Sequence, residues 1–445
     1  MRKIAIVFAA AFFPFIANAA TFTVTPKTLQ ARLLENNIDL AMQLNKVYQA
    51  KDNVDRSRKN LLPGVSLNGA IDSTFSFSLS TVNMLLPFLL PSNWLDLKEN
   101  QSLLNAQGDA YYIAQLNAYS SAYALYSTIQ GDLDLRDILQ DQYSNYKKIE
   151  DLIKMAVDAG MMEKADLLQA RAQTQMTAIQ VSQMDALILQ EKAAIREMLA
   201  LPLSTTIQFG RTRVASSSVE DQSLQRTANQ SIAKSPELRQ LNAMVEAANA
   251  AKWSSFWGFL TGASLGTSRG PTGAFSEVDG SASMRLGFGQ FLVLKIGNRN
   301  LAQIELQKSQ LSYDHAQLVE STVGTLREAQ QQVELARQAE NSLREVYNNE
   351  VNKFQAGQTD LLHVLNAGNA LTSAFTNKVK ARTSLDTLRI SLHRLMISDQ
   401  FSSIQRCRVY KKGTSGLKGK LGRIFNPNKD KITLDQACGP QVSEN

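Results

Sequence analysis

The sequence predicts an exported α+β membrane protein built from two tandem copies of one unit. Each unit has two strands and several long helices. Three observations predict this fold: a leader at the start of the chain, a repeat with a period of about 197 positions, and a change from helical to strand periodicity within each copy.

Residues 1–19 have the pattern of a secretory signal peptide. Arg2 and Lys3 precede an apolar run over residues 4–16, and an A-x-A cleavage triplet follows at 17–19. No later apolar run reaches the ~18 residues of a spanning helix. If the exported chain lies in a membrane, it must therefore do so as a closed β-barrel.

The repeat is visible in two separate windows. "AVDAGMMEKADLLQARAQTQ", from Ala156, matches "KFQAGQTDLLHVLNAGNALT", from Lys353, when Gly160 is aligned with Gly357. A second window aligns residues 40–67 with residues 238–265 at nearly the same offset. The predicted divisions are a signal peptide at 1–19, a first repeat at 20–230, a second repeat at 231–405 and a basic tail at 406–445.

Each copy has the same predicted order of elements. A helix (29–60 and 236–257) precedes a β-hairpin (about 64–92 and 262–292), and two long helices then turn near 160 and near 357. Alternation in the first hairpin predicts two faces. The residues predicted to face lipid are Val65, Leu67, Ile71, Met84, Leu86 and Phe88, and those predicted to face the lumen are Asn68 and Asp72.

Four strands are too few to close a transmembrane barrel, so other subunits must complete it. The duplicated order of elements, with "AGMMEKADLLQAR", "AGQTDLLHVLNA" and "LLPGVSL", resembles the TolC-type outer-membrane efflux proteins. The resemblance covers about residues 29–398. It implies a homotrimer with one twelve-stranded barrel, continuous with a long α-helical coiled-coil barrel that forms a periplasmic tunnel.

The resemblance also implies roles for the two Ala-Gly turns. They are expected at the far periplasmic end of the tunnel, where they dock a periplasmic adaptor; alternatively, the glycines are only helix C-caps. The residues predicted at these turns are Ala159, Gly160, Met161, Ala356, Gly357, Gln358 and Thr359. The residues predicted at the tunnel entrance are Asp166, Asp360, His363 and Asn366. Three copies of His363 would form a ring that is neutral near pH 7 and cationic at lower pH; alternatively, His363 points into a helix contact and lines nothing.

Other residues carry separate predictions. Trp94, Trp253, Trp257 and Phe291 lie where helices meet strands, which suits either a membrane-interface belt or an ordinary core. Cys407 and Cys438 are the only cysteines, and in an oxidising compartment they predict a disulfide. The tail from Arg406 carries nine Lys/Arg and three Asp/Glu, either as a solvated extension or as a contact to anionic lipid or peptidoglycan.

The sequence contains no sign of catalysis. The three histidines lack metal-ligand spacing, and no nucleophile or phosphate-binding motif is present, so we expect no enzyme activity, no cofactor and no metal. Without its leader and tail the chain is close to neutral, which argues against nucleic-acid binding.

Two functions are consistent with these features. The first is an exit duct in the bacterial outer membrane, serving an efflux pump or type I secretion system. Its partners would be a periplasmic membrane-fusion adaptor, an inner-membrane transporter of the RND or ABC type, and outer-membrane lipid. The second is a soluble periplasmic coiled-coil protein with a structural or adaptor role. The sequence does not identify the cargo.

Overall fold

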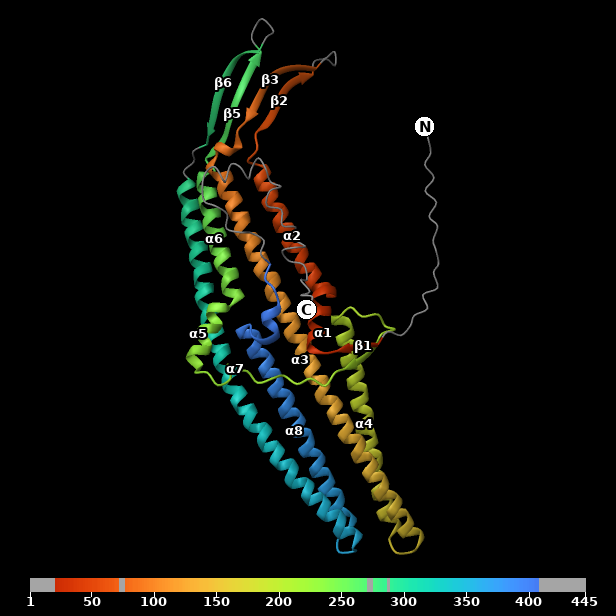
Figure 1. Cartoon of the computed structure of the whole chain (residues 1–445). Coiled ribbons are helices and arrows are strands. Elements are labelled where there is room, and N and C mark those ends of the chain that lie inside the picture. Colours follow the sequence, from red (N-terminus) through yellow and green to blue (C-terminus); the bar gives the residue numbers. More distant parts are fainter. Residues whose placement is uncertain (1–20, 72–76, 270–274, 286–288, 408–445) are drawn as a thin grey trace, which may run out of the picture.

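The computed structural model describes residues 21–71, 77–269, 275–285 and 289–407. The molecule is elongated, with strands at one end, helices along its length and two helical hairpins at the other end (Figure 1). The predicted signal peptide and nearly all of the predicted tail lie outside the described residues, as does Asp72.

The helices dominate the described chain. They are α1 (Pro26–Asn36), α2 (Ile38–Lys59), α3 (Pro91–Asp158), α4 (Lys164–Met198), α5 (Leu224–Lys234), α6 (Pro236–Trp257), α7 (Gln290–Gln355) and α8 (Leu361–Met396), with short 3₁₀ turns η1 (Pro87–Leu89) and η2 (Asp399–Ser403). The strands are β1 (Thr21–Val24), β2 (Gly64–Ile71), β3 (Phe77–Leu85), β4 (Thr206–Phe209), β5 (Leu260–Arg269) and β6 (Phe275–Met284). No helix in the described ranges is long and apolar enough to cross a membrane.

The duplication appears in the lengths of the elements. Helices α1 and α2 have 11 and 22 residues, and so do α5 and α6. The single helix predicted over 29–60 is therefore wrong: Asn37 is extended, and its side chain caps α2 by accepting from Leu40 N–H at 3.0 Å. Ser235 caps α6 in the same way. Because α5 matches α1, we infer that the second repeat begins near Leu224.

Four strands form one antiparallel sheet in the order β2-β3-β5-β6. Strands β3 and β5 join the two copies, and β2 and β6 are the edges of the open sheet. Val65 pairs with Met84, and both side chains are exposed. The strand predicted through Phe88 is shorter than expected: β3 ends at Leu85, and Pro87, which has no backbone N–H to donate, begins η1.

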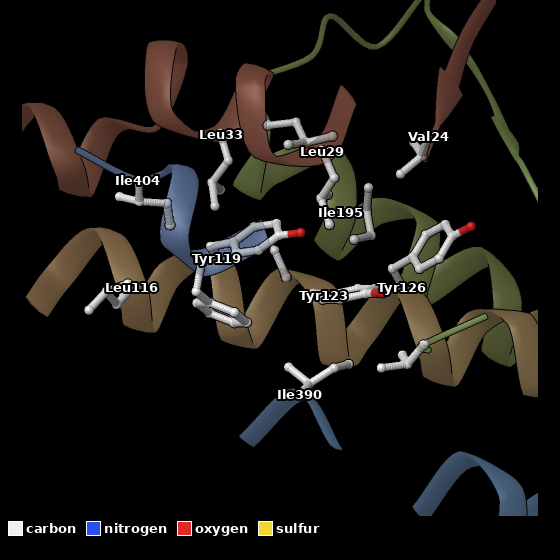
Figure 2. Packing of buried hydrophobic residues seen from close by; sticks show 14 of the residues in the cluster. Val24, Leu29, Leu33, Leu116, Tyr119, Tyr123, Tyr126, Ile195, Ile390 and Ile404 are labelled. Atoms are coloured by element: carbon white, nitrogen blue, oxygen red, sulfur yellow. The ribbon is translucent and has the colours of Figure 1, made fainter. Parts of the chain in front are cut away.

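A belt of short elements lies beside the long helices at mid-height. It consists of α1, α5, η2 and the parallel pair β1–β4 (Figure 1). Its core is a row of tyrosines on one face of α3, Tyr119, Tyr123 and Tyr126, all almost fully buried. Side chains from α1, α4, α8 and the segment around η2 pack around them (Figure 2). The tyrosine row therefore links the two copies at the point where the hairpins begin.

Buried polar groups fix the second copy to the belt. Glu220, which follows β4, accepts from Arg389 Nε of α8 at 3.1 Å and from Gln330 Nε2 of α7 at 2.7 Å. Ser231 Oγ of α5 donates to Leu395 O at 2.9 Å and lies 2.7 Å from His315 Nε2 of α7. Because the single hydroxyl hydrogen of Ser231 is used, His315 must donate through Nε2.

Burial lowers the pKa of His315; Glu237 opposes this shift, and Arg394 adds to it. The folded state therefore favours the neutral ring, and stability should fall as pH drops below the ordinary imidazole value, because the unfolded chain then binds the proton more readily. We expect His315→Gln to lose less thermal stability between pH 8 and pH 5.5 than the wild type. Exposed His363→Gln is the contrasting control: Asp360 raises the pKa of His363, so this variant should lose more stability at acid pH than the wild type, not less. Equal acid sensitivity of His315→Gln and wild type would contradict this.

Candidate docking and entrance site at the helical tips

The two hairpins end in turns with the same backbone hydrogen bonds. In the first turn, Met161 N–H donates to Ala156 O at 2.8 Å and Gly160 N–H to Val157 O at 2.9 Å. This pair of bonds is a Schellman motif, and Gly160 takes the left-handed conformation with φ +73°. The turn therefore ends α3 and reverses the chain within a few residues.

The second turn has the same geometry. Gln358 N–H donates to Lys353 O at 2.9 Å, Gly357 N–H donates to Phe354 O at 3.0 Å, and Gly357 has φ +69°. Ala159 and Ala356 are the C-cap residues before the two glycines. The repeated Ala-Gly pair in the sequence thus corresponds to two equivalent reversals, which lie at the same end of the molecule (Figure 1).

The next helix starts at the same position after each glycine. Glu163 caps α4 in a capping box with Asp166, whose carboxylate accepts from Glu163 N–H at 3.3 Å. Asp360 caps α8 by accepting from His363 N–H at 3.1 Å. The predicted entrance residues Asp166 and Asp360 therefore have a local structural role at helix N-termini.

The surfaces of the two turns differ chemically. Met161 is 75% exposed in the first turn, where the second turn has polar Gln358 and Thr359. Met162 instead packs into the apolar cluster between the hairpins. The described residues include no group of three or more His, Cys, Asp or Glu that could hold a metal ion. The tips thus offer one apolar and one polar contact surface.

Contacts between α3, α4 and α8 hold the two hairpins together above the tips. Gln173 Nε2 of α4 donates to Asn369 Oδ1 of α8 at 2.9 Å. Gly368 permits close approach, since a Cβ there would lie 2.4 Å from Tyr146 Oη. These residues were not predicted from the sequence. Their signal was weak, because Gln, Asn and Gly at these positions gain meaning only when the neighbouring helix is known.

His363 pairs with the residue that caps its own helix. Its Nδ1 lies 2.7 Å from Asp360 Oδ1, and both side chains are well exposed. The hydrogen bond to Asp360 raises the pKa of His363, and the same contact lowers the pKa of Asp360. Asn366 is exposed one turn further along α8. The structure thus brings His363 and Asp360 together. The raised pKa means that the His363 side chain takes up its proton at a higher pH than an ordinary histidine does.

Aromatic residues gather at the opposite end, where helices meet strands. Trp94 Nε1 donates to Phe88 O at 2.8 Å, and Trp253 is partly exposed beside Phe256. Trp257 lies in the same ring cluster, stacked on Phe259. Phe291 is in α7, but its side chain lies outside the described part. The three tryptophans thus lie where helices meet strands, and their contact with lipid stays a prediction.

The root of the tail is fixed to the helices. Arg406 Nη2 donates to Asp109 Oδ2 at 2.8 Å, and Asp109 is only 1% exposed on α3. Cys407 is buried against α2 and α3 and is not a free thiol. Cys438 lies outside the described residues, so the pairing of the two cysteines stays a prediction.

The pattern of the outer membrane efflux protein family matches residues 29–201, which include the first hairpin and its tip turn. Residues 29–201 belong to that family. The family predicted from the sequence is therefore confirmed, and it consists of channel proteins. No curated protein matches the chain.

Solved outer membrane channels share the fold over most of their length. The Campylobacter jejuni CmeC channel is 15% identical, with a TM-score of 0.71 over 85% of this chain and 88% of its own. VceC from Vibrio cholerae is 14% identical, with a TM-score of 0.69 over 84% and 95%. The open-state MtrE channel of Neisseria gonorrhoeae is 13% identical, with a TM-score of 0.68 over 83% and 88%.

The tip glycines yield a test of the turns. Alanine at φ near +70° costs about 1–2 kcal/mol, and no atom would lie within 4 Å of a Cβ at Gly160 or Gly357, so the cost is conformational alone. We expect Gly160→Ala to speed hydrogen exchange at the Met161 amide by about tenfold. Gly324→Ala in α7 is the control, since it also has open space but has no positive φ. Unchanged exchange at Met161 would show that the turn does not depend on glycine.

The pairing of His363 yields a second test. Asp360→Asn should lower the pKa of His363 towards its ordinary value, because the largest cause of the upward shift is removed. NMR titration of labelled histidine in the purified protein measures this. Asp166→Asn, in the other hairpin, should leave the titration unchanged. A pKa of His363 that is the same in Asp360→Asn and wild type would exclude the pairing.

Proposed function

We propose that the chain is one third of an outer-membrane export duct. Three copies would close side by side into a hollow wall of helices that continues into a closed barrel of strands. The observation that carries this proposal is the pair of uncovered apolar faces at the two lateral edges of the helical wall.

The wall is one helix thick, and its contacts give the order of the helices. In the half nearer the strands, neighbours in contact run α2, α3, α6, α7. In the half nearer the tips they run α4, α3, α8, α7. One edge of the wall is therefore α7 throughout. The other edge is α2 in one half and α4 in the other.

In a single chain, both edges expose large apolar side chains to solvent. On α7 these are Leu292, Ile296, Leu306, Tyr313, Leu335 and Val346. On the opposite edge they are Ile38 and Met42 of α2 and Leu168, Met176, Ile179 and Leu189 of α4. Apolar area of this extent is typical of a protein–protein interface, and its length along both edges favours another copy of the chain.

The strands have the same open edges. One chain supplies four strands, with β2 and β6 unpaired on their outer sides within the described residues. Three copies would join β6 of one chain to β2 of the next and make a twelve-stranded barrel, which leaves no strand edge exposed. The same arrangement of three copies would thus close both the helical wall and the sheet.

The proposed duct is passive and lies in the outer membrane, with the tips in the periplasm. The tip turns would dock a periplasmic adaptor of the membrane-fusion type, which would connect the duct to an inner-membrane transporter of the RND or ABC type. An efflux pump is favoured by the family name and by relatives described as outer membrane channels. A type I secretion system would use the same geometry.

The alternative is a soluble periplasmic structural or adaptor protein. The duplicated hairpins and the four-stranded sheet argue against it, since such a protein has no need of matched open edges in both halves. Fractionation separates the two functions: an outer-membrane trimer that is heat-modifiable in gels supports the duct, and a soluble monomer rejects it.

In cells, Gly357→Pro should block export while leaving the trimer intact, because the tip is far from the sheet.

The lateral faces provide a direct test of assembly. Leu306→Arg combined with Tyr313→Arg should convert the trimer to monomers in detergent, because each apolar side chain lost from an interface costs about 1.5–3 kcal/mol and the new charges would be buried. Size-exclusion chromatography with light scattering measures the mass. Glu305→Arg, on another face of the same helical turns, should remain trimeric. A trimer of the chain that carries both Leu306→Arg and Tyr313→Arg would show that α7 does not form the interface.

A further inference from the structure

A polar hollow lies beside the point where the helices meet the sheet. It has a volume of about 380 Å³ and opens between the last turns of α2 and the first turns of α3. Every residue that lines it is polar: Asn53, Arg56, Ser57, Asn60, Asn93, Asp96, Glu99 and Asn100. The proposed adaptor docking and transport do not use this hollow.

Half of the lining is held in place by hydrogen bonds. Asn100 Nδ2 donates to Ser57 Oγ at 2.9 Å and so joins the two walls. Asn93 Nδ2 donates to Pro87 O at 2.8 Å, and Asp96 accepts from Ser254 of α6. The polar groups of the hollow therefore stand on a rigid frame.

The other half keeps unused hydrogen-bonding capacity. Within the described ranges, the side chains of Asn53, Arg56, Asn60 and Glu99 make no hydrogen bond to protein. Partial burial raises the pKa of Glu99, and the nearby carboxylate of Asp96 raises it further. A bound cation would relieve this repulsion between carboxylates. Arg56, on the facing helix, offers a guanidinium to an anion.

Exposed apolar side chains begin directly next to the hollow, on the side of the sheet. Leu62 lies two residues beyond Asn60, and Leu89 lies in the turn that Asn93 holds through Pro87 O. Val65 and Met84, a cross-strand pair whose side chains are exposed, continue this surface onto β2 and β3. A polar hollow with both signs of charge thus opens onto a strip of apolar surface.

We propose that this hollow binds the headgroup of a phosphoethanolamine phospholipid, with the acyl chains along the apolar strip. Arg56 would pair with the phosphate, and the carboxylates of Glu99 and Asp96 would accept from the ammonium. Asn53 and Asn60 would donate to the phosphate and glycerol oxygens. The proposal rests on the proposed function, which places the sheet in a membrane and the hollow at its periplasmic face.

The chemistry of the hollow selects among lipids. A phosphatidylglycerol headgroup has no ammonium to satisfy Glu99 and Asp96 and brings only negative charge. A phosphatidylcholine headgroup has positive charge but no N–H donor, so its hydrogen bonds to the two carboxylates are lost. The ethanolamine headgroup alone among these three satisfies both the guanidinium and the carboxylates.

The test is equilibrium binding of dioctanoyl lipids to the purified, delipidated full chain in detergent, followed by native mass spectrometry. We expect dioctanoyl-phosphatidylethanolamine to bind at least about tenfold more tightly than the phosphatidylglycerol and phosphatidylcholine analogues. Arg56→Gln and Glu99→Gln should each weaken ethanolamine-lipid binding by about tenfold. Lys59→Gln and Asp52→Asn are the controls: they make the same charge changes on exposed residues of α2 outside the hollow and should bind as wild type.

Several outcomes would overturn the proposal. Equal binding of the three lipids by wild type would do so, and so would unchanged binding by both hollow variants that elute at the wild-type mass. Chain-free glycerophosphoethanolamine that binds as tightly as the lipid would assign the hollow to a soluble ligand instead. The mass and the membrane fraction of the protein are measured separately. If the protein is an outer-membrane trimer but does not prefer the ethanolamine lipid, the lipid site is rejected and the proposed function stands.

Discussion

A wall one helix thick can bury apolar side chains only along the seams between neighbouring helices, and most of this molecule obeys that constraint. Helices α3 and α7 run nearly the whole length of the helical part, and each seam must be filled by a different partner in the two halves. Helix α3 has neighbours on both sides throughout. Helix α7 has one side without a neighbour, and the resulting apolar edges motivate the proposed trimer.

The change of partners takes place at the belt. On the strand side of the belt α3 packs on α2 and α6, and on the tip side it packs on α4 and α8. Tyr119, Tyr123 and Tyr126 fill the space where these four helices begin or end. The hydroxyl of Tyr119 donates to Pro26 O and Gln400 Oε1, and that of Tyr126 donates to Gly210 O. Tyrosine rings with a polar hydroxyl end suit this junction. Where a seam changes partners, there is space to fill and there are polar groups that need a hydrogen-bond partner. The belt therefore allows α3 to pack against a different pair of helices in each half of the wall.

Much of this fold was accessible from the sequence because it is periodic. The aligned glycines gave both tip turns, since only a residue without Cβ adopts the positive φ of a Schellman reversal at low cost. The long helices and the residue range of α6 also followed from helical spacing. Both hairpins were found, although β3 ends earlier than alternation suggested because Pro87 interrupts pairing.

The remaining features depend on contacts that periodicity does not encode. The break at Asn37 is set by a side-chain cap, and the β1–β4 pair joins segments far apart in the chain. His363 was assigned to the entrance by resemblance, whereas its pairing with Asp360 appears only with the rotamers. The lining of the hollow comes from polar residues on two helices whose adjacency the sequence did not show.

The central claim is that the α7 edge of one chain meets the α4 edge of the next. Met176 on α4 and Ser342 on α7 are both exposed and lie at nearly the same distance along their helices from Gly160 and Gly357. A cysteine at each position, in a chain carrying both substitutions, should form covalent dimers and trimers in intact cells on treatment with a short bifunctional thiol reagent. Chains with either substitution alone should not. Cross-links found only within single chains, or none in a protein of wild-type export activity, would contradict closure of the wall by copies of this chain.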